Sequence, residues 1–414
     1  MDGKRAYHLL EKLCFTRVGG SKEELKAANI ILDEIKAAGG NGEIIPFEVN
    51  AFNVKKATLT TSNGKEYEVS GWSYTGSTPE EGITADFYYM ETYGDVDKVN
   101  AKGKIVLVNG MPYQEDYKAV LASGALAFIS FNGDVADDHC DLNYNEVEDL
   151  FFPGKPIPAV NMRVRDAIEL VREYPEKVTL TLLQDELKET SHNVIAEIKG
   201  TTYPEEVIVY TAHYDSVLYS KGVYDNGAGS VTIMEMYRHY LVNPPKRTVR
   251  FIWCGSEERG LLGSFAYVKN NEEELKNIKF ILNADVGACV LGVDNIIVTG
   301  HESIVHAIDF ITKEKGISAC VKQGIYSSDH IPFVDKGIPA INFVRNGARG
   351  ASHIHDRHDT MFFLSAAALQ KTIDLVEVLS NMFVNAVALP FNSEIPENVK
   401  KDINKYLGKE EKKS

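Results

Sequence analysis

Between residues 213 and 359 the chain carries five short groups of histidine and acidic residues, whose side chains can hold metal ions. Imidazole and carboxylate groups together are suited to zinc, and one carboxylate can bridge two such ions. In chain order the groups are His213-Tyr214-Asp215, Asp225-Asn226-Gly227, Glu257-Glu258, Asp285 and His355-Asp356-Arg357-His358-Asp359. Their composition predicts a site for two metal ions that carries out hydrolysis.

Each of the first four groups follows a run that we interpret as a buried strand. Ligands of open α/β sheets bind at the carboxyl ends of the strands, so these groups are expected to meet at one edge of a sheet. Helical segments lie between most of the strands, which predicts an α/β fold with a mixed, mostly parallel sheet flanked by helices. The expected strands are 193–198, 206–212, 248–254, 279–285, 295–300 and 340–344.

The first two groups offer ligands and a partner for a ligand. His213 and Asp215 share one face of an extended segment, so Asp215 can hold the ring nitrogen of His213 that does not bind metal. The alternative is a turn-forming aspartate beside a hydrogen-bonded histidine. Asp225 precedes a predicted helix, where its carboxylate can bridge two cations, and Gly227 and Gly229 allow the backbone to pass close to the site. The alternative for Asp225 is a helix N-cap in a flexible turn.

The adjacent Glu257 and Glu258 follow an apolar run that reads as a strand. Two neighbouring carboxylates repel each other and favour protonation unless a cation compensates them. One of them can then bind metal while the other faces the attacking water, because a general base must not be used up in coordination. Two solvated surface glutamates are the alternative. Asp285 also ends an apolar run, where an unpaired charge would be costly.

Three histidines in the stretch ASHIHDRHDT, which contains the last group, could each complete the site. They are His353, His355 and His358, and residue type and spacing do not choose among them. Arg345 and Arg349 lie close by in the sequence and could contact a substrate carboxylate, although solvated surface arginines are the more ordinary interpretation.

Together the motifs resemble the M28 family of metallo-aminopeptidases over nearly the whole chain. The matching pieces stand in the order HYDS, YDNGAGS, GSEERGLLGS, NADVG, SSDHIPFVDKGIPA and HDRHDT. Each piece alone has low specificity, but their order and spacing together are highly specific. The resemblance implies a zinc-dependent aminopeptidase that hydrolyses the N-terminal peptide bond of peptides with a free N-terminus.

The resemblance also implies which residues bind the two zinc ions. The last histidine of the family stands four residues before an Asp-Thr pair, which selects His355, ahead of Asp359-Thr360. The expected ligands are His213, Asp225 and Asp285 for one ion, and Asp225, Glu258 and His355 for the other. Cobalt or manganese could take the place of zinc, because imidazole and carboxylate ligands accept these metals to different degrees.

The resemblance implies catalytic roles for three further side chains. Glu257 matches the general base, which acts on a water that bridges the metals, and Asp215 matches the acid that orients the first histidine. Tyr326 is the candidate donor to the oxyanion, with a plain packing role as its alternative.

The chain divides into a discontinuous catalytic domain, expected at 1–54 and 188–392, and a smaller β-rich domain inserted at 55–187. Within the insertion, Asn63-Gly64 predicts a hairpin. The stretches GKIVLVNG and YKAVLASGALAFISFNG resemble the protease-associated (PA) domain often found inside such enzymes. Residues 393–414 are charged and poor in apolar side chains, so a tail that frays at its end is expected there.

Composition agrees with a protein of two ordinary globular domains. The chain has 414 residues, of which 44% are hydrophobic and 25% are charged. A net charge of −15 argues against nucleic acid or an anionic membrane as partner, although it can also reflect solubility alone. The five cysteines form no CxxC pair, which favours a reducing compartment. No signal peptide and no membrane-spanning run is visible, so the sequence predicts a cytoplasmic protein.

Three classes of function are compatible with the motifs. The aminopeptidase is favoured because all five ligand positions are present together with the insertion. A glutaminyl-cyclase-like acyltransferase shares the scaffold but uses one zinc ion, and another small-amide hydrolase is open because the motifs specify the reaction centre and not the pocket. A metal-free binding module would carry substitutions at ligand positions, and none is visible. The preference for an N-terminal residue and the oligomeric state are not encoded in any motif.

Overall fold

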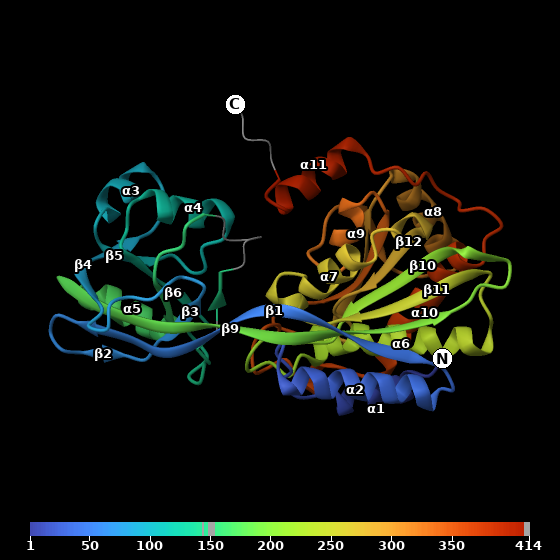
Figure 1. Cartoon of the computed structure of the whole chain (residues 1–414), viewed down its shortest axis with the longest axis horizontal. Helices are drawn as coiled ribbons and strands as arrows, with labels where there is room; N and C mark the ends of the chain where they lie inside the picture. Colours follow the sequence, from blue (N-terminus) through green and yellow to red (C-terminus); the bar gives the residue numbers. More distant parts are fainter. Residues whose placement is uncertain (143–144, 148–153, 410–414) are drawn as a thin grey trace. The chain divides into compact units, whose positions relative to one another are not determined.

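The computed structural model of the chain describes residues 1–142, 145–147 and 154–409. They form two compact units: unit 1 comprises Met1–Val49 with Thr190–Ser414, and unit 2 comprises Asn50–Glu189. The chain passes from unit 1 into unit 2 along strand β1 (Gly42–Thr61) and returns along strand β9 (Lys177–Ile198), as Figure 1 shows. Each unit contains hydrophobic clusters of its own.

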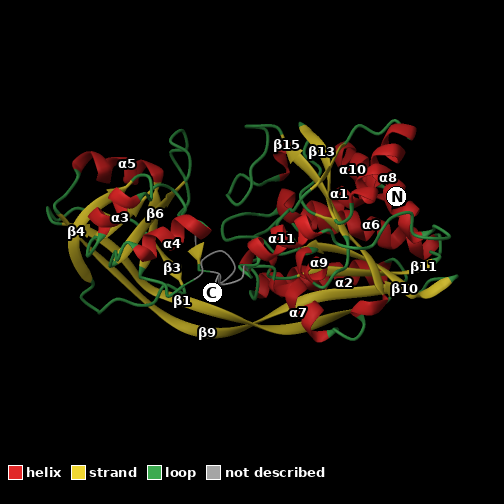
Figure 2. Cartoon of the chain, turned by 90° about the horizontal axis from the view of Figure 1, so that it is seen from above, coloured by secondary structure: helices red, strands yellow, loops and turns green. Residues whose placement is uncertain are grey.

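Unit 1 is built on a sheet with the strand order β14-β13-β15-β12-β10-β11-β9. The bounds are β10 Tyr203–His213, β11 Arg247–Cys254, β12 Ile278–Ala284, β13 Gly292–Thr299, β14 Cys320–Gln323 and β15 Ala340–Gly347. Strand β10 is parallel to β11 and β12, and β12 is parallel to β15. Antiparallel pairs join β13 to β15, which lie side by side in Figure 2, and β9 to β11. The predicted mixed, mostly parallel sheet is therefore confirmed.

Helices cover both faces of this sheet. Their bounds are α1 Gly3–Lys12, α2 Lys22–Ala37, α6 Ala228–Val242, α7 Leu262–Asn270, α8 Glu302–Glu314, α9 Ile331–Asp335 and α10 Ala366–Val384. Helices α1, α6 and α10 contact one another, and α7 contacts α9. In Figure 1, α2 and α6 lie below the strands of unit 1, while α7 and α9 lie above them. Ser21 and Ser365 cap α2 and α10 through their hydroxyl oxygens, which accept backbone N–H groups.

Helix α11 (Glu397–Tyr406) forms within the charged C-terminal segment and contacts α9. Val399 and Ile403, four residues apart, face the same side of this helix and are buried. The fraying predicted for the end of the chain falls largely on residues 410–414, which lie outside the described residues. None of the described helices is long and apolar enough to cross a membrane.

Unit 2 has a second, smaller sheet with the order β9-β4-β5-β6-β8-β3-β7. Its elements are β2 Glu66–Tyr67, β3 Ser70–Ser73, β4 Ile83–Met90, α3 Asp95–Ala101, β5 Ile105–Val108, α4 Gln114–Ala122, β6 Ala127–Asn132, β7 Asn145–Glu146, β8 Ala159–Arg163 and α5 Val164–Glu173. The hairpin predicted at Asn63-Gly64 is confirmed, since β1 and β2 pair on either side of it. Trp72, fully buried, packs edge-on against Phe128 in one of its cores.

Candidate metal centre

Two of the predicted ligands lie at the carboxyl edge of the unit 1 sheet. His213 is the last residue of β10 and is level with Cys254, the last residue of β11. Asp285 follows β12 directly, and β12 is the other parallel neighbour of β10. Because parallel strands end at the same edge, their terminal side chains meet there, as the sequence predicts.

Asp225 lies at the same edge of the sheet but belongs to a different kind of element. It does not follow a strand, which corrects our expectation; it lies in a turn, η1 (Val223–Gly227), where the backbone angles of Asp225 and Asn226 are not helical, and this turn leads into α6. The neighbouring Asn226 ties this turn to the end of β12. Its amide donates to the carbonyl of Ala284 at 2.8 Å, and its Oδ1 accepts from the backbone of Val286 at 3.1 Å. Sequence reasoning assigned no role to Asn226.

The two carboxylate oxygens of Asp225 face two different histidines. Oδ1 lies 3.1 Å from Nε2 of His213, and Oδ2 lies 2.9 Å from Nε2 of His355. His355 is also 3.2 Å from a carboxylate oxygen of Glu258. This arrangement places one carboxylate between two imidazoles, which is the geometry that a bridging ligand requires.

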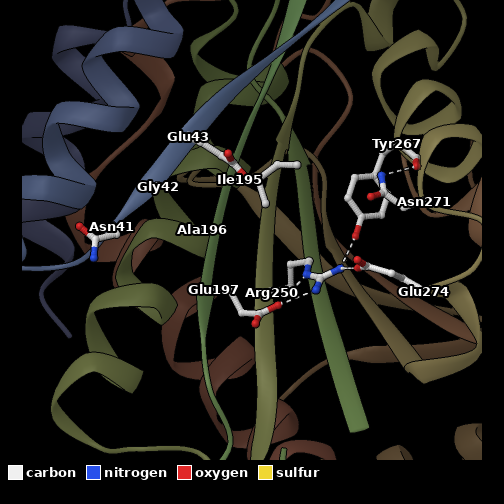
Figure 3. A pocket seen from close by; sticks show the side chains of 10 residues that line it. All are labelled: Asn41, Gly42, Glu43, Ile195, Ala196, Glu197, Arg250, Tyr267, Asn271 and Glu274. Carbon is white, nitrogen blue, oxygen red and sulfur yellow. Dashed lines mark hydrogen bonds and ion pairs between the residues drawn. The ribbon is translucent and has the colours of Figure 1, made fainter. Parts of the chain in front are cut away.

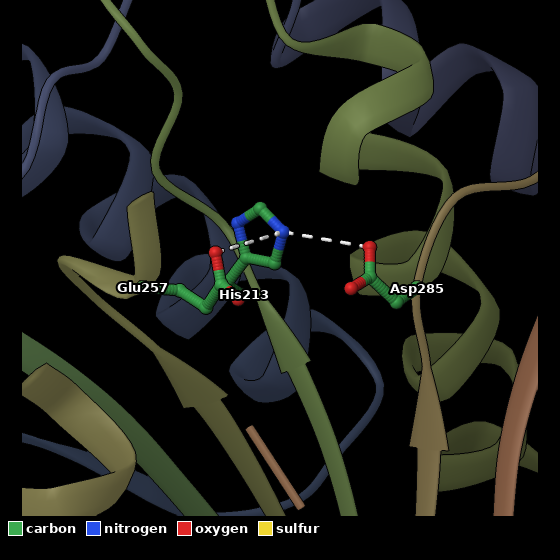
Figure 4. Close-up of side chains that lie close together, drawn as sticks. All are labelled: His213, Glu257 and Asp285. Carbon is green, nitrogen blue, oxygen red and sulfur yellow. Dashed lines mark ion pairs between the residues drawn. The ribbon is translucent and has the colours of Figure 1, made fainter. Parts of the chain in front are cut away.

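His213 is the centre of the other half of the site. Its Nε2 lies 3.6 Å from Asp285 Oδ1 and 3.7 Å from Glu257 Oε2, and Figure 4 shows the ring between these two carboxylates. Its other nitrogen, Nδ1, lies 3.4 Å from Asp215. Asp215 also accepts the backbone N–H groups of Glu257 and Glu258 at 3.1 and 3.3 Å. One buried aspartate therefore lies beside the ring of His213 and accepts the backbone N–H groups of both glutamates.

The structure also distinguishes the three candidate histidines. His355 contacts Asp225 and Glu258, whereas His353 pairs with Asp356 at 3.1 Å, and all three histidines are exposed residues. The backbone of His355 has a left-handed φ of 59°, which is uncommon for a residue with a side chain. Asp359 accepts the backbone N–H groups of Tyr224 and Asp225 at 2.8 and 3.1 Å.

Burial and mutual repulsion perturb the acid–base behaviour of these groups. Burial raises the pKa of Glu257 well above its usual value, against the influence of His213, and the charge of Asp285 adds to the shift. Burial lowers the pKa of His213, but Glu257 and the other surrounding carboxylates outweigh it and raise that pKa well above the usual value. Mainly through burial, the pKa values of Asp329 and Asp359 are each raised to about 7.

The donor atoms of this cluster suit a divalent cation. In two sets, His213 with Glu257 and Asp285, and His213 with Asp225 and Glu258, the possible ligand atoms lie within 4.8 Å of one another. Glu258 Oε1 and Asp285 Oδ1 are buried without a hydrogen-bond partner. Imidazole and carboxylate are ligands that zinc accepts, and a cation would satisfy these atoms and relieve the repulsion among the carboxylates.

The sequence left both a functional and a structural interpretation open for Tyr326 and for Arg345. Tyr326 is partly buried against the core of unit 1, and burial raises its pKa well above the usual value, with Asp285 and Asp225 adding to the shift. Arg345 is buried, pairs with Asp294 at 2.9 Å and donates to the carbonyl of Cys289. It is therefore neither a solvated surface arginine nor a free partner for a substrate, while Arg349 is exposed.

A pocket of about 500 Å³ elsewhere in unit 1 contains none of the predicted ligands. Figure 3 shows that its arginine, Arg250, is held by Glu197, Glu274 and the hydroxyl of Tyr267. The positive charge of this pocket is therefore already paired.

Comparison with known proteins identifies the family. A profile of peptidase family M28 matches residues 193–380. Aminopeptidase YwaD of Bacillus subtilis (strain 168) is 31% identical over 395 residues, which cover 90% of this chain and 83% of that protein. The chain belongs to peptidase family M28.

Other members and structures agree with the M28 assignment. The structure of a zinc aminopeptidase from Bacillus subtilis superposes with a TM-score of 0.77 at 27% identity and covers 96% of this chain and 99% of that one. The probable leucine aminopeptidase 2 of Trichophyton verrucosum (strain HKI 0517) is 30% identical over 65% of this chain, which spans 54% of that relative's length. The M28 chain is a hydrolase of peptide bonds, and the resemblance carried by its motifs is confirmed.

Proposed function

We propose that the protein is a zinc-dependent aminopeptidase with two ions in its active site. The observation that carries the proposal is Asp225, whose two oxygens face one histidine each. The proposed ligands are His213, Asp225 and Asp285 for one ion, and Asp225, Glu258 and His355 for the other. Relatives named as aminopeptidases, and a zinc aminopeptidase with the same fold, support the choice of metal and of reaction.

Glu257 is the proposed general base. Its carboxylate lies 3.7 Å from Nε2 of His213, next to the proposed ligands but in neither proposed ligand set. When bound, the zinc ions would lower the pKa of a shared water and polarise the scissile carbonyl. Glu257 then takes the proton of the attacking water and gives it to the leaving amine. Asp215 keeps His213 in its orientation and fixes the backbone of Glu257.

The proposed substrate is a peptide with a free N-terminus. A panel of aminoacyl substrates, each with a free or an acetylated amine, tests this with zinc-loaded protein. Release from the free-amine members alone is the expected result, and the same panel ranks side-chain preference. A second arm offers a peptide with N-terminal glutamine. Cyclisation of that peptide without release from any other member would replace the aminopeptidase by a glutaminyl-cyclase-like acyltransferase.

Unit 2 is the proposed PA-like domain. The proposal rests on the hydrophobic cores of unit 2, on its sheet, and on its position in the sequence. Unit 2 runs from Asn50 to Glu189, between the two segments of unit 1.

Replacing Tyr326 by phenylalanine tests the proposed oxyanion donor. The change removes one hydroxyl and keeps the ring, so we expect kcat to fall by about 10²-fold with little change in KM. Steady-state kinetics on the best aminoacyl substrate measures both constants. Tyr240→Phe is the matched control, because its hydroxyl bonds Tyr210 inside the core at 3.1 Å. Unchanged kcat in Tyr326→Phe would leave Tyr326 with a packing role only.

The stability of the metal-free and zinc-loaded proteins should depend on pH in opposite directions. A carboxyl group with a raised pKa contributes stability below its unfolded pKa and loses it as the pH rises through its folded pKa. Asp329 and Asp359, raised from 3.8 to about 7, therefore make the metal-free protein less stable as the pH rises from 4 to 7. The raised pKa of His213 acts in the same direction above pH 6.5, and the lowered pKa of Asp225 acts only at lower pH.

Zinc reverses this dependence because its ligands must lose their protons to bind it. Urea unfolding at pH 5 and pH 8, with chelator and with zinc, measures the four free energies of unfolding. We expect the metal-free protein to be more stable at pH 5 than at pH 8. We expect zinc to raise the free energy of unfolding more at pH 8 than at pH 5. Equal effects of zinc at both values would contradict binding through protonatable ligands.

A further inference from the structure

Arg17, in the loop between α1 and α2, is a fully buried cation held by backbone carbonyls alone. It donates to five of them. Nη1 donates to Leu13, Phe15 and Lys221 at 2.9, 3.1 and 2.5 Å, Nη2 donates to Gly222 at 2.5 Å, and Nε donates to Tyr214. The planar guanidinium thus faces five carbonyls, three of them around Nη1 and one each at Nη2 and Nε.

No carboxylate forms an ion pair with Arg17 in the part of the chain that the structure describes. Burial of such a cation is costly, and it lowers the pKa of Arg17. The charges that oppose this shift belong to Asp359, Asp215 and Asp225, which surround the candidate metal centre. Arg17 therefore adds a fixed positive charge beside a cluster that is rich in carboxylates, without occupying any of their oxygens.

Three of the five carbonyls belong to one loop, residues 214–222, which connects His213 to the turn carrying Asp225. The backbone of Arg17 also pairs with Ser216 of this loop. Its N–H donates to Ser216 Oγ at 3.0 Å, and its carbonyl accepts from the N–H of Ser216 at 3.3 Å. The loop approaches Arg17 so closely that a Cβ on Gly222 would lie 3.0 Å from its guanidinium.

We propose that Arg17 is a positioning residue that fixes the loop 214–222, so that His213 and Asp225 face each other before metal binds. The inference rests on the proposed function, because Arg17 acts through two of the proposed zinc ligands. It touches neither ligand side chain. Its partners are the carbonyls at both ends of the loop, and they act together with the hydrogen bonds of Asn226 and Asp359 that hold the Asp225 turn.

Arg17→Lys tests the proposal, because lysine keeps the charge but has three donors in place of five. We expect zinc affinity, measured by competition with a chromophoric chelator, to fall by about 10–100-fold, as for other residues that orient metal ligands. In the metal-free variant, amide hydrogen exchange in a peptide covering 214–227 should become faster. Ser216→Ala is the milder second variant, since it disturbs the same loop without altering a buried charge. Should Arg17→Lys not fold, the same two changes in Ser216→Ala carry the test.

Arg247→Lys is the matched control. Arg247 is also buried and donates to the carbonyls of Phe383 and Ala386, and it pairs with Glu206 at 2.7 Å. It stands at the first residue of β11, whereas the centre lies at the last. We expect it to lose stability while keeping zinc affinity and exchange in 214–227. Equal losses of zinc affinity in both lysine variants, or unchanged exchange in Arg17→Lys, would overturn the role of Arg17. If the unaltered protein binds no zinc, the proposed function fails. Faster amide exchange of residues 214–227 in Arg17→Lys would still show that Arg17 stabilises the loop.

Discussion

Glu257→Gln should lower kcat by about 10²–10⁴-fold, the usual contribution of a general base. Glutamine has nearly the shape of glutamate but cannot take a proton at neutral pH. Glu257 lies 3.7 Å from His213 and is not one of the proposed ligands, so the variant should still bind zinc. Steady-state kinetics on a free-amine aminoacyl substrate, together with metal analysis of the same sample, measures both properties.

The control for this change is Glu235→Gln. Glu235 is fully buried on α6 but bonds Arg5 and Arg238 and belongs to no part of the candidate centre. We expect it to cost stability while leaving kcat close to that of the unaltered protein. If Glu257→Gln keeps kcat within a few-fold, another group must accept the proton. If it loses zinc along with activity, Glu257 acts as a ligand, as its place in one of the two possible ligand sets allows.

Asp225→Asn should remove most of the activity by weakening both metal positions at once. Side chains that only support a ligand cost about 10–100-fold in metal affinity or activity when replaced, and a ligand shared by two ions should exceed that range. The amide lacks the negative charge and offers one oxygen where the carboxylate offers two. Metal analysis should find fewer than two zinc ions per chain, and kcat/KM should fall more than in any of the other variants.

Asp97→Asn provides a comparison for Asp225→Asn in unit 2. Asp97 is buried and accepts hydrogen bonds from Tyr88 and Thr92, so its replacement disturbs a buried carboxylate far along the chain from the predicted ligands. Zinc content and activity should not change in this variant. Two tightly bound zinc ions in Asp225→Asn would contradict a bridging role for Asp225, whatever its activity.

The N-terminus of α2 shows which interactions depend on neighbours in sequence and which depend on tertiary contacts. Ser21 and Glu24 predict a capping box, and Ser21 Oγ does accept the N–H of Glu24 at 3.1 Å. One oxygen of Glu24 accepts the N–H of Gly20 at 3.3 Å, close to the helix start, while the other accepts from Ser191 and from the hydroxyl of Tyr214, at 2.5 and 3.2 Å. The start of α2 was predictable because it depends on neighbours in sequence. The bonds to Ser191 and Tyr214 were not, since these residues lie about 170 to 190 positions away.

His355, the last of the predicted ligands, shows more clearly what residue spacing alone does not predict. His353 and His355 stand on the same face of an extended segment, so residue type could not separate them, and the family resemblance was needed to favour His355. In the structure the left-handed backbone of His355 turns its ring toward Asp225 and Glu258, while His353 pairs with Asp356.

The sequence by itself determined the sheet, the helices that flank it, the family and the kind of chemistry. These follow from patterns of apolar residues that recur over a few positions and from motifs of a few residues, which local structure preserves. Tertiary structure alone decided that Asp225 reaches the centre from a turn and not from a strand, and that Asn226 ties this turn to β12. It also decided that Arg17 donates to carbonyls of the loop between His213 and Asp225. The physical reason is that hydrogen-bond partners about 200 residues apart leave no periodicity or composition for a sequence pattern to detect.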